Sequence, residues 1–159
     1  MDQESKKKSL RMITYGLYIL TVKEGDVIGA GTVNWLSQAS FTPPLVMVGV
    51  KADSQLHALI SKTGRFAISI LAHDQKNIAS DFFRPTQMEG QKLNGHPYEL
   101  SPTFQYPILT ECPAWFEAKV TDSVAQGDHT IFVGEVQDAG VRESREPLVM
   151  HQTGWFYGG

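Results

Sequence analysis

Three short runs of β-branched and aromatic residues fall within the first 50 positions of the chain, and they constrain the fold more than any other feature. They are YGLYILTV at Tyr15–Val22, VIGAGTVNW at Val27–Trp35 and LVMVGV at Leu45–Val50. Lys23–Asp26 (KEGD) is a turn signal between the first two runs. Gly29 and Gly31 indicate a bulge or a close approach of other atoms to the second strand. The chain is therefore expected to begin with antiparallel strands.

Two helices and another strand are expected next. Asp53 can cap a helix that Gly64 ends, and apolar positions follow the cap at helical spacing, namely Leu56, Leu59 and Ile60. Phe66–Leu71 (FAISIL) predicts a strand and Gln75–Phe83 a short helix.

The second half of the chain contains one long irregular stretch, Pro85–Pro113, with five prolines. Loops of this length are usually functional, so we expect it to cover a site. Ala114–Ser123 and Thr130–Val141 are β-rich, with a turn at residues 126–129. Turns every 8–12 residues favour a closed antiparallel barrel of six to seven strands over an alternating βαβ sheet.

Composition excludes several classes of protein. With 14 Lys and Arg against 17 Asp and Glu, the 159-residue chain has a net charge of −3, which disfavours nucleic acid as a partner. No apolar run approaches the ~20 residues that cross a bilayer, and the polar start of the chain does not resemble a secretory signal, so we expect a cytoplasmic protein without membrane contact. Residues 1–11, with a Lys6–Lys8 run, are expected to form a flexible tail, and 12–159 one domain.

Common catalytic motifs are absent. Gly29-Ala30-Gly31 lacks the third glycine of a dinucleotide fingerprint, because Asn34 stands there, and there is neither a P-loop nor a nucleophile elbow. The five histidines are scattered, so no metal site is expected, and all but His129 are taken to be solvated. Cys112 is expected to be a small buried hydrophobe rather than a nucleophile, and as the only cysteine it forms no intrachain disulfide.

Five segments together resemble the flavin reductase family, whose members bind FMN or FAD on a split β-barrel. They are YGLYILT (15–21), GTVNWLSQASFTPP (31–44), KADSQLHALI (51–60), GDHTIFVGEV (127–136) and PLVMHQTGWFY (147–157). The resemblance is greatest to the flavin-reductase-like domains of diflavin flavodiiron proteins and high-molecular-weight rubredoxins. It implies a six-stranded antiparallel Greek-key split barrel, the FMN-binding split barrel, with a few short helices.

The resemblance also implies the flavin contacts. The ring and ribityl chain would be lined by residues of one segment, namely Val33, Asn34, Trp35, Leu36, Ser37, Ala39 and Ser40. The alternative is that Ser37 and Ser40 only form turns and that Trp35 belongs to the core. Phe82 and Phe83, of which Phe83 is counted among the flavin contacts, would wall the dimethylbenzene edge of the ring, or both would be core residues.

The flavin phosphate is expected at the start of the helix that follows Asp53, because helix amides and the helix dipole attract anions. Ser54 and Gln55 would contact it, with Lys51 as a counter-charge. The alternative is that Ser54 only caps the helix. Leu56 stands where family members often have a hydroxyl residue, so the choice of FMN or FAD stays open.

His129 matches the histidine of the family's Gly-Asp-His turn, which lies by the flavin and is associated with the nicotinamide substrate. The resemblance thus implies an oxidoreductase in which NADH or NADPH reduces FMN, with FAD as an alternative cofactor. A non-enzymatic FMN electron carrier serving a redox protein is the other reading. A homodimer is expected, because Trp35, Phe41 and Trp155-Phe156 would be exposed, and a redox protein or monooxygenase is the expected partner.

Overall fold

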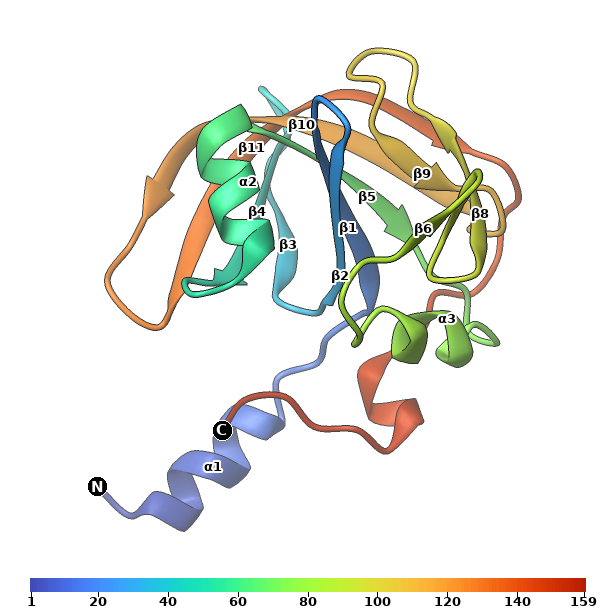
Figure 1. Cartoon of the computed structure of the whole chain (residues 1–159). Helices are drawn as coiled ribbons and strands as arrows, with labels where there is room; N and C mark the ends of the chain where they lie inside the picture. The colour runs from blue at the N-terminus through green and yellow to red at the C-terminus, as the bar shows by residue number, and fades with distance from the viewer.

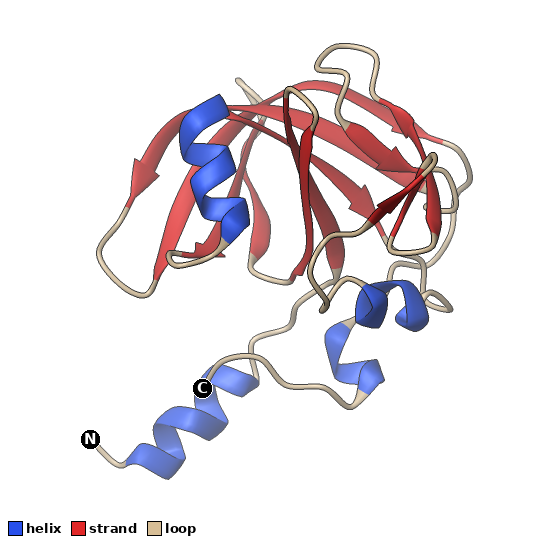
Figure 2. Cartoon of the chain, viewed as in Figure 1, coloured by secondary structure: helices blue, strands red, loops and turns tan.

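The main feature of the computed structural model, which describes residues 1–159, is a strongly curved antiparallel sheet of seven strands (Figure 1, Figure 2). The strand order is β2-β1-β5-β10-β11-β4-β3. The strands are β1 (Tyr18–Glu24), β2 (Val27–Val33), β3 (Leu36–Ser40), β4 (Leu45–Lys51), β5 (Arg65–Ile70), β10 (Ala114–Val124) and β11 (His129–Val141). The expected mainly β, antiparallel split barrel is confirmed, with seven strands in its sheet rather than six. The edge strands β2 and β3 do not pair with each other, so the closed barrel that the turn spacing favours is not formed.

One strand, β3, was not expected. Residues 36–44 (LSQASFTPP) are rich in Ser, Thr and Pro, a composition that favours neither a strand nor a helix. Leu36 nevertheless pairs with Val48 and Ser37 with Met47, so β3 extends the sheet beyond β4 as an edge strand. Backbone pairing with a well-formed neighbouring strand outweighs the weak local preference of these residues.

The two glycines of β2 allow helix α2 (Gln55–Thr63) to lie close to the sheet. A Cβ atom on Gly29 would stand 2.6 Å from Cδ1 of Leu59, and one on Gly31 would stand 2.8 Å from Cδ1 of Leu56. The close approach expected at these glycines is confirmed, and the approaching atoms belong to α2. Figure 2 shows α2 against the curved sheet.

The cap of α2 differs by one residue from the expectation. Ser54, not Asp53, is the N-cap, and its hydroxyl accepts a hydrogen bond from the backbone amide of His57. Asp53 lies in the turn before it. Gly64 ends the helix with a left-handed backbone (φ 65°), as expected.

The Pro85–Pro113 stretch is more regular than expected. After α3 (Lys76–Asp81) it forms a small four-stranded sheet. The strands are β6 (Met88–Glu89), β7 (Lys92–Leu93), β8 (His96–Leu100) and β9 (Pro107–Leu109). The strands are very short, and Asn94 and Gly95 with positive φ form the tight turn between β7 and β8, which explains why no hydrophobic period marks them.

His96 is a correction to the expectation of solvated histidines. Its ring is buried, with Nε2 2.7 Å from Asp81 Oδ2 and Nδ1 2.8 Å from a Glu111 carboxylate oxygen. The imidazole thereby joins the end of α3 to the loop after β9. Buried histidines are normally held by hydrogen bonds of this kind.

The amino-terminal segment also differs from the expected flexible tail. Residues Gln3–Arg11 form helix α1, which Asp2 caps by accepting a hydrogen bond from the Ser5 amide. A Glu4–Lys8 ion pair at (i, i+4) spacing supports the helix. None of its side chains is buried, and the helix stands apart from the barrel beside the carboxyl terminus (Figure 1).

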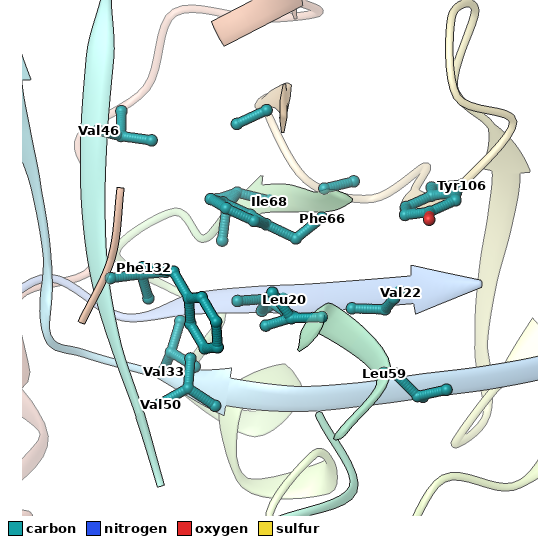
Figure 3. Packing of buried hydrophobic residues seen from close by; sticks show 14 of the residues in the cluster. Leu20, Val22, Val33, Val46, Val50, Leu59, Phe66, Ile68, Tyr106 and Phe132 are labelled. Carbon is teal, nitrogen blue, oxygen red and sulfur yellow. The ribbon is translucent and has the colours of Figure 1, made fainter. Parts of the chain in front are cut away.

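Two clusters of buried apolar side chains pack against the curved sheet, the first inside the barrel. Figure 3 shows part of the first, in which Leu20, Phe66 and Phe132 approach one another from β1, β5 and β11. The second cluster lies between the sheet, α3 and the small sheet, and includes Ile19, Phe82 and Cys112. These clusters fix the strand ends from which the site is built.

Candidate functional site

A cavity of about 480 Å³ opens where β2 and β4 end, next to the start of α2. Its size is that of an ordinary small-molecule pocket. Most of its lining is apolar, with a few polar and charged groups among the aromatic side chains. The lining residues are Leu17, Thr32, Val33, Asn34, Gly49, Val50, Lys51, Ser54, Leu56, Phe83, His129, Met150, Trp155, Phe156 and Tyr157.

The end of β2 contributes a buried amide to the cavity. Asn34 is 6% exposed, and its side-chain nitrogen donates to the sulfur of Met150 at 3.1 Å. A thioether is a weak acceptor. The Asn34 side-chain amide is therefore only weakly hydrogen-bonded within the protein. A polar edge of a ligand can replace the Met150 sulfur as its acceptor.

The end of β4 and the start of α2 contribute positive potential. The Ser54 hydroxyl donates to the Lys51 carbonyl at 2.7 Å while it caps the helix. Nζ of Lys51 lies 3.7 Å from a carboxylate oxygen of Asp53, and both side chains are largely exposed. This loose ion pair contributes little and leaves the ammonium group free to bind an anion beside the helix terminus.

His129, the first residue of β11, has a hydrogen-bond partner on each ring nitrogen. Nδ1 lies 2.8 Å from Oδ1 of Asp128, and Nε2 lies 2.7 Å from the hydroxyl of Tyr157. The hydrogen bond from His129 lowers the pKa of Asp128, so that carboxyl group is ionised. Burial raises the pKa of Tyr157, so its phenol keeps the proton.

Trp35 lies behind His129. The two rings pack with centroids 4.4 Å apart, and the ring of Tyr157 lies 5.2 Å from the indole. The indole nitrogen of Trp35 is buried and has no hydrogen-bond partner in the protein. Trp35 is thus a support for His129 and Tyr157, placed just outside the cavity lining.

The carboxyl-terminal segment, residues 155–157, covers one side of the cavity. Trp155 packs edge-on against Phe83 and beneath the Lys76 ammonium group, which lies 4.7 Å from its ring. Arg11 holds the segment from the other side, because it stacks on Phe156 and donates to the carbonyl of Gly158. The expectation that Pro85–Pro113 covers the site is therefore corrected: that stretch contributes nothing to the lining.

The structure gathers only part of the expected site residues. Those at the cavity are Val33, Asn34, Lys51, Ser54, Phe83 and His129. Leu36, Ser37, Ala39 and Ser40 lie instead on the edge strand β3, outside the lining, and Gln55 is exposed on the first turn of α2. Phe83 lines the cavity, as the flavin-wall alternative requires, whereas Phe82 is a core residue.

Sequence reasoning missed the residues that the carboxyl-terminal segment brings to the cavity, above all Tyr157. The available signal was the run of three aromatic residues at 155–157, which has no apolar period of a strand or helix. Aromatic side chains in such an irregular segment are either exposed or packed on a distant surface. Here the Tyr157 ring packs on Trp35, which lies more than 100 positions earlier in the chain.

Other chemistry is not found near the cavity. Cys112 is buried in the second cluster, and burial raises its pKa to about 12. Its thiol therefore stays protonated and packs as a small hydrophobic side chain. No group of three or more His, Cys, Asp or Glu side chains is placed to hold a metal ion. None of the helices has both the length and the apolar character needed to cross a membrane.

Comparison with known proteins relates this architecture to flavoproteins. The chain is 32% identical to the NADH-dependent flavin reductase StyB of Pseudomonas fluorescens, over 92% of this chain and 84% of that protein. It is also 32% identical to a high molecular weight rubredoxin of Moorella thermoacetica, over 89% of this chain. This chain spans only 62% of the length of the rubredoxin.

Solved structures give the same result. BorF, the flavin reductase component of a bacterial two-component tryptophan halogenase, superimposes with a TM-score of 0.82 at 29% identity, over 99% of this chain and 98% of BorF. The styrene monooxygenase flavin reductase of Pseudomonas putida S12 superimposes with a TM-score of 0.76 at 27% identity, over 93% of this chain and 91% of that protein. The family model described as flavin reductase like domain matches residues 10–159. The chain therefore belongs to the flavin reductase like domain family.

Proposed function

We propose that the protein is an NAD(P)H-dependent flavin reductase that binds FMN, with FAD as the less favoured flavin, in the cavity described above. The observation that carries the proposal is the combination of an apolar slot with a cationic helix start at one end. A flavin mononucleotide has these two parts, because a flat apolar ring is joined through a polar chain to a phosphate. StyB and BorF, both named as flavin reductases, support the activity.

The residues present fit such a group. Asn34, whose amide has only the Met150 sulfur as a partner, suits the polar edge of the ring. Ser54, Lys51 and the first turn of α2 suit the phosphate. A flavin bound there would supply the redox chemistry, as the acceptor of a hydride from the nicotinamide.

The protein's own contribution is then mainly positional. Phe83 and Trp155 pack together at the cavity and would form its apolar wall on that side. His129 presents its ring at the cavity, with Trp35 behind it, and would orient the hydride donor. Holding two reactants in a reactive geometry lowers a barrier by up to about 7–11 kcal/mol, so no dedicated acid or base is needed.

NAD(P)H oxidation measured with and without added flavin tests the proposal. Turnover that requires added FMN indicates a reductase that uses flavin as a substrate, and turnover without it indicates a bound cofactor. Calorimetry is expected to give tighter binding for FMN than for FAD. FAD binding tighter by tenfold, about 1.4 kcal/mol, would reverse the choice of flavin.

The similarity to a rubredoxin and to diflavin flavoprotein A 1 of Synechocystis supports a second candidate, an FMN electron carrier without NAD(P)H activity. These relatives join a domain like this one to further sequence, since the chain spans 62% and 25% of them. A yellow protein that exchanges electrons with a redox partner but does not oxidise NADH or NADPH would favour this candidate.

Two kinds of partner belong to the proposal. A monooxygenase that takes up reduced flavin is supported by a relative from Acinetobacter baylyi named as the reductase component of trigonelline monooxygenase. A second copy of this chain is supported by the unpaired outer edge of β3 and by Phe41 beside it, which is 89% exposed. Trp35, which was expected to be exposed, is instead half-buried behind His129.

Light scattering tests the dimer, and a mass of 17.6 kDa, that of one chain, would exclude it.

A cytoplasmic location is also part of the proposal, because the single cysteine requires no oxidising compartment.

A further inference from the structure

Three polar groups form a hydrogen-bonded row at the edge of the cavity: the Asp128 carboxylate, the His129 imidazole and the Tyr157 hydroxyl. His129 and Tyr157 line the cavity, whereas Asp128 does not. The His129 side chain is 14% exposed and that of Asp128 93%. Asp128 therefore acts on the cavity only through His129.

The protons in this row can be assigned from the chemistry of its ends. An ionised carboxylate accepts hydrogen bonds and donates none, so Nδ1 of His129 must carry a proton. In the neutral imidazole Nε2 then has a lone pair, and the Tyr157 hydroxyl must donate to it. A phenol that keeps its proton can do so. Asp128 thus selects one of the two imidazole tautomers, and the donation from Tyr157 is consistent with it.

We propose that Asp128 is a positioning residue that makes Nε2 of His129 a hydrogen-bond acceptor at the cavity, and that the site thereby selects a hydride donor whose ring carries a primary carboxamide. The inference rests on the proposed function. A carboxamide N–H group can donate to Nε2, as the Tyr157 hydroxyl does in the resting protein. A carboxylate at the same ring position can only accept and leaves Nε2 without a partner.

The Tyr157 hydroxyl is a replaceable partner for Nε2. The Tyr157 residue is 45% exposed and its neighbour Phe156 62% exposed, so the segment buries little apolar area where it crosses the cavity. The Trp35 indole, which packs on Tyr157, has its N–H buried without a hydrogen-bond partner, and such an arrangement is unfavourable. A hydride donor can therefore displace the hydroxyl while His129 stays in place against Trp35.

The tautomer is tested first, on the flavin-free protein, by nitrogen NMR of the histidine rings at alkaline pH. The wild type is expected to show His129 with the proton on Nδ1. In Asp128→Asn the new side chain can donate as well as accept, so the Nε2-protonated form should appear. Asp122→Asn, on the exposed part of β10, is the matched control and should leave the spectrum of His129 unchanged. A wild-type His129 protonated on Nε2 would overturn the proposal.

The choice of donor is tested next, by comparing kcat/KM for reduced nicotinamide dinucleotide with that for its nicotinic acid analogue. The wild type and Asp122→Asn should prefer the amide by about tenfold or more, the size of one hydrogen bond made or left unmade. Asp128→Asn should lose most of this preference while its FMN affinity stays unchanged. An unchanged preference in Asp128→Asn would overturn the proposal.

Tyr157→Phe separates the tyrosine from the aspartate. This variant keeps the ring and removes the competing hydroxyl, so the KM for the amide donor should fall several-fold with kcat retained, and the preference for the amide should persist. A rise in KM would show that Tyr157 helps to bind the donor. It would overturn the proposal that the donor displaces the Tyr157 hydroxyl from Nε2 of His129. If the wild type oxidises neither donor, the proposed function fails and donor selection with it, whereas the NMR result still decides the tautomer.

Discussion

Lys51 and His129 lie directly opposite each other as register partners at the ends of β4 and β11. The loops beyond them are also joined, because the amide of Ala52 donates to the carbonyl of Asp128 at 2.9 Å. The cationic group proposed for the phosphate and the imidazole proposed for the hydride donor therefore stand on one rung of the sheet. Their separation is set by backbone hydrogen bonds rather than by flexible loops.

Ser54→Asp is expected to weaken FMN binding by at least about tenfold, since like charges about 4 Å apart repel by 1–4 kcal/mol near a protein surface. The fold should be retained, because Asp is as good an N-cap as Ser. Ser61→Asp adds the same charge on the exposed surface further along α2 and should leave the affinity unchanged. A fluorescence titration of FMN measures both variants, and equal affinities would move the phosphate to another place.

His129→Ala is expected to raise the KM for NAD(P)H or to slow the reduction of bound flavin, while the FMN dissociation constant changes by no more than a few-fold. The reason is that the ring and phosphate are assigned to other groups. Stopped-flow reduction together with a flavin titration measures the two effects, with His73→Ala, an exposed histidine, as control. Normal reduction and normal FMN binding in His129→Ala would remove this residue from the site.

Glu117→Ala is expected to destabilise the fold by about 3 kcal/mol or more, because it leaves buried donors unsatisfied. The Glu117 carboxylate is fully buried and accepts hydrogen bonds from the Ser101 hydroxyl and from the amides of Thr103 and Phe104. Urea unfolding measures the loss, and Glu143→Ala, on the surface, is the control. A loss of less than 1 kcal/mol would contradict this role.

Cys112 is expected to resist alkylation in the native protein, because burial raises its pKa to about 12 from the ordinary value of 9.0. The unfolded chain loses this proton at lower pH than the folded one. The contribution to stability is therefore complete below pH 9 and is lost as the pH rises from about 9 to 12. Mass spectrometry after iodoacetamide treatment counts adducts, and rapid native labelling at neutral pH would refute the prediction.

The hairpin of β1 and β2 and the helix α2 could be predicted because their signals are local. The KEGD turn separates two β-rich runs, and leucines at helical spacing precede Gly64. The helix α1 was missed because its cap and its Glu4–Lys8 pair are surface features without an apolar period. Polar composition indicates exposure, but it does not distinguish an exposed helix from a tail.

The candidate site was predictable only in the parts that neighbour one another in sequence. Ser54 and Lys51 follow from a strand that leads into a helix. The contact of Tyr157 with His129 joins residues 28 positions apart through an irregular segment, and no propensity describes it. The edge position of Leu36–Ser40 likewise depends on which strand the segment meets.

The glycines at 29 and 31 determine where the first turn of α2 lies, and with it the position of the proposed anion site. Each lacks the single carbon atom that would push Leu59 or Leu56 outward, and with it the helix whose first turn faces the cavity. The location of the proposed anion site thus depends on two missing methyl groups at positions that do not themselves line the cavity. Substitutions at these two positions would shift the site without altering any residue in it.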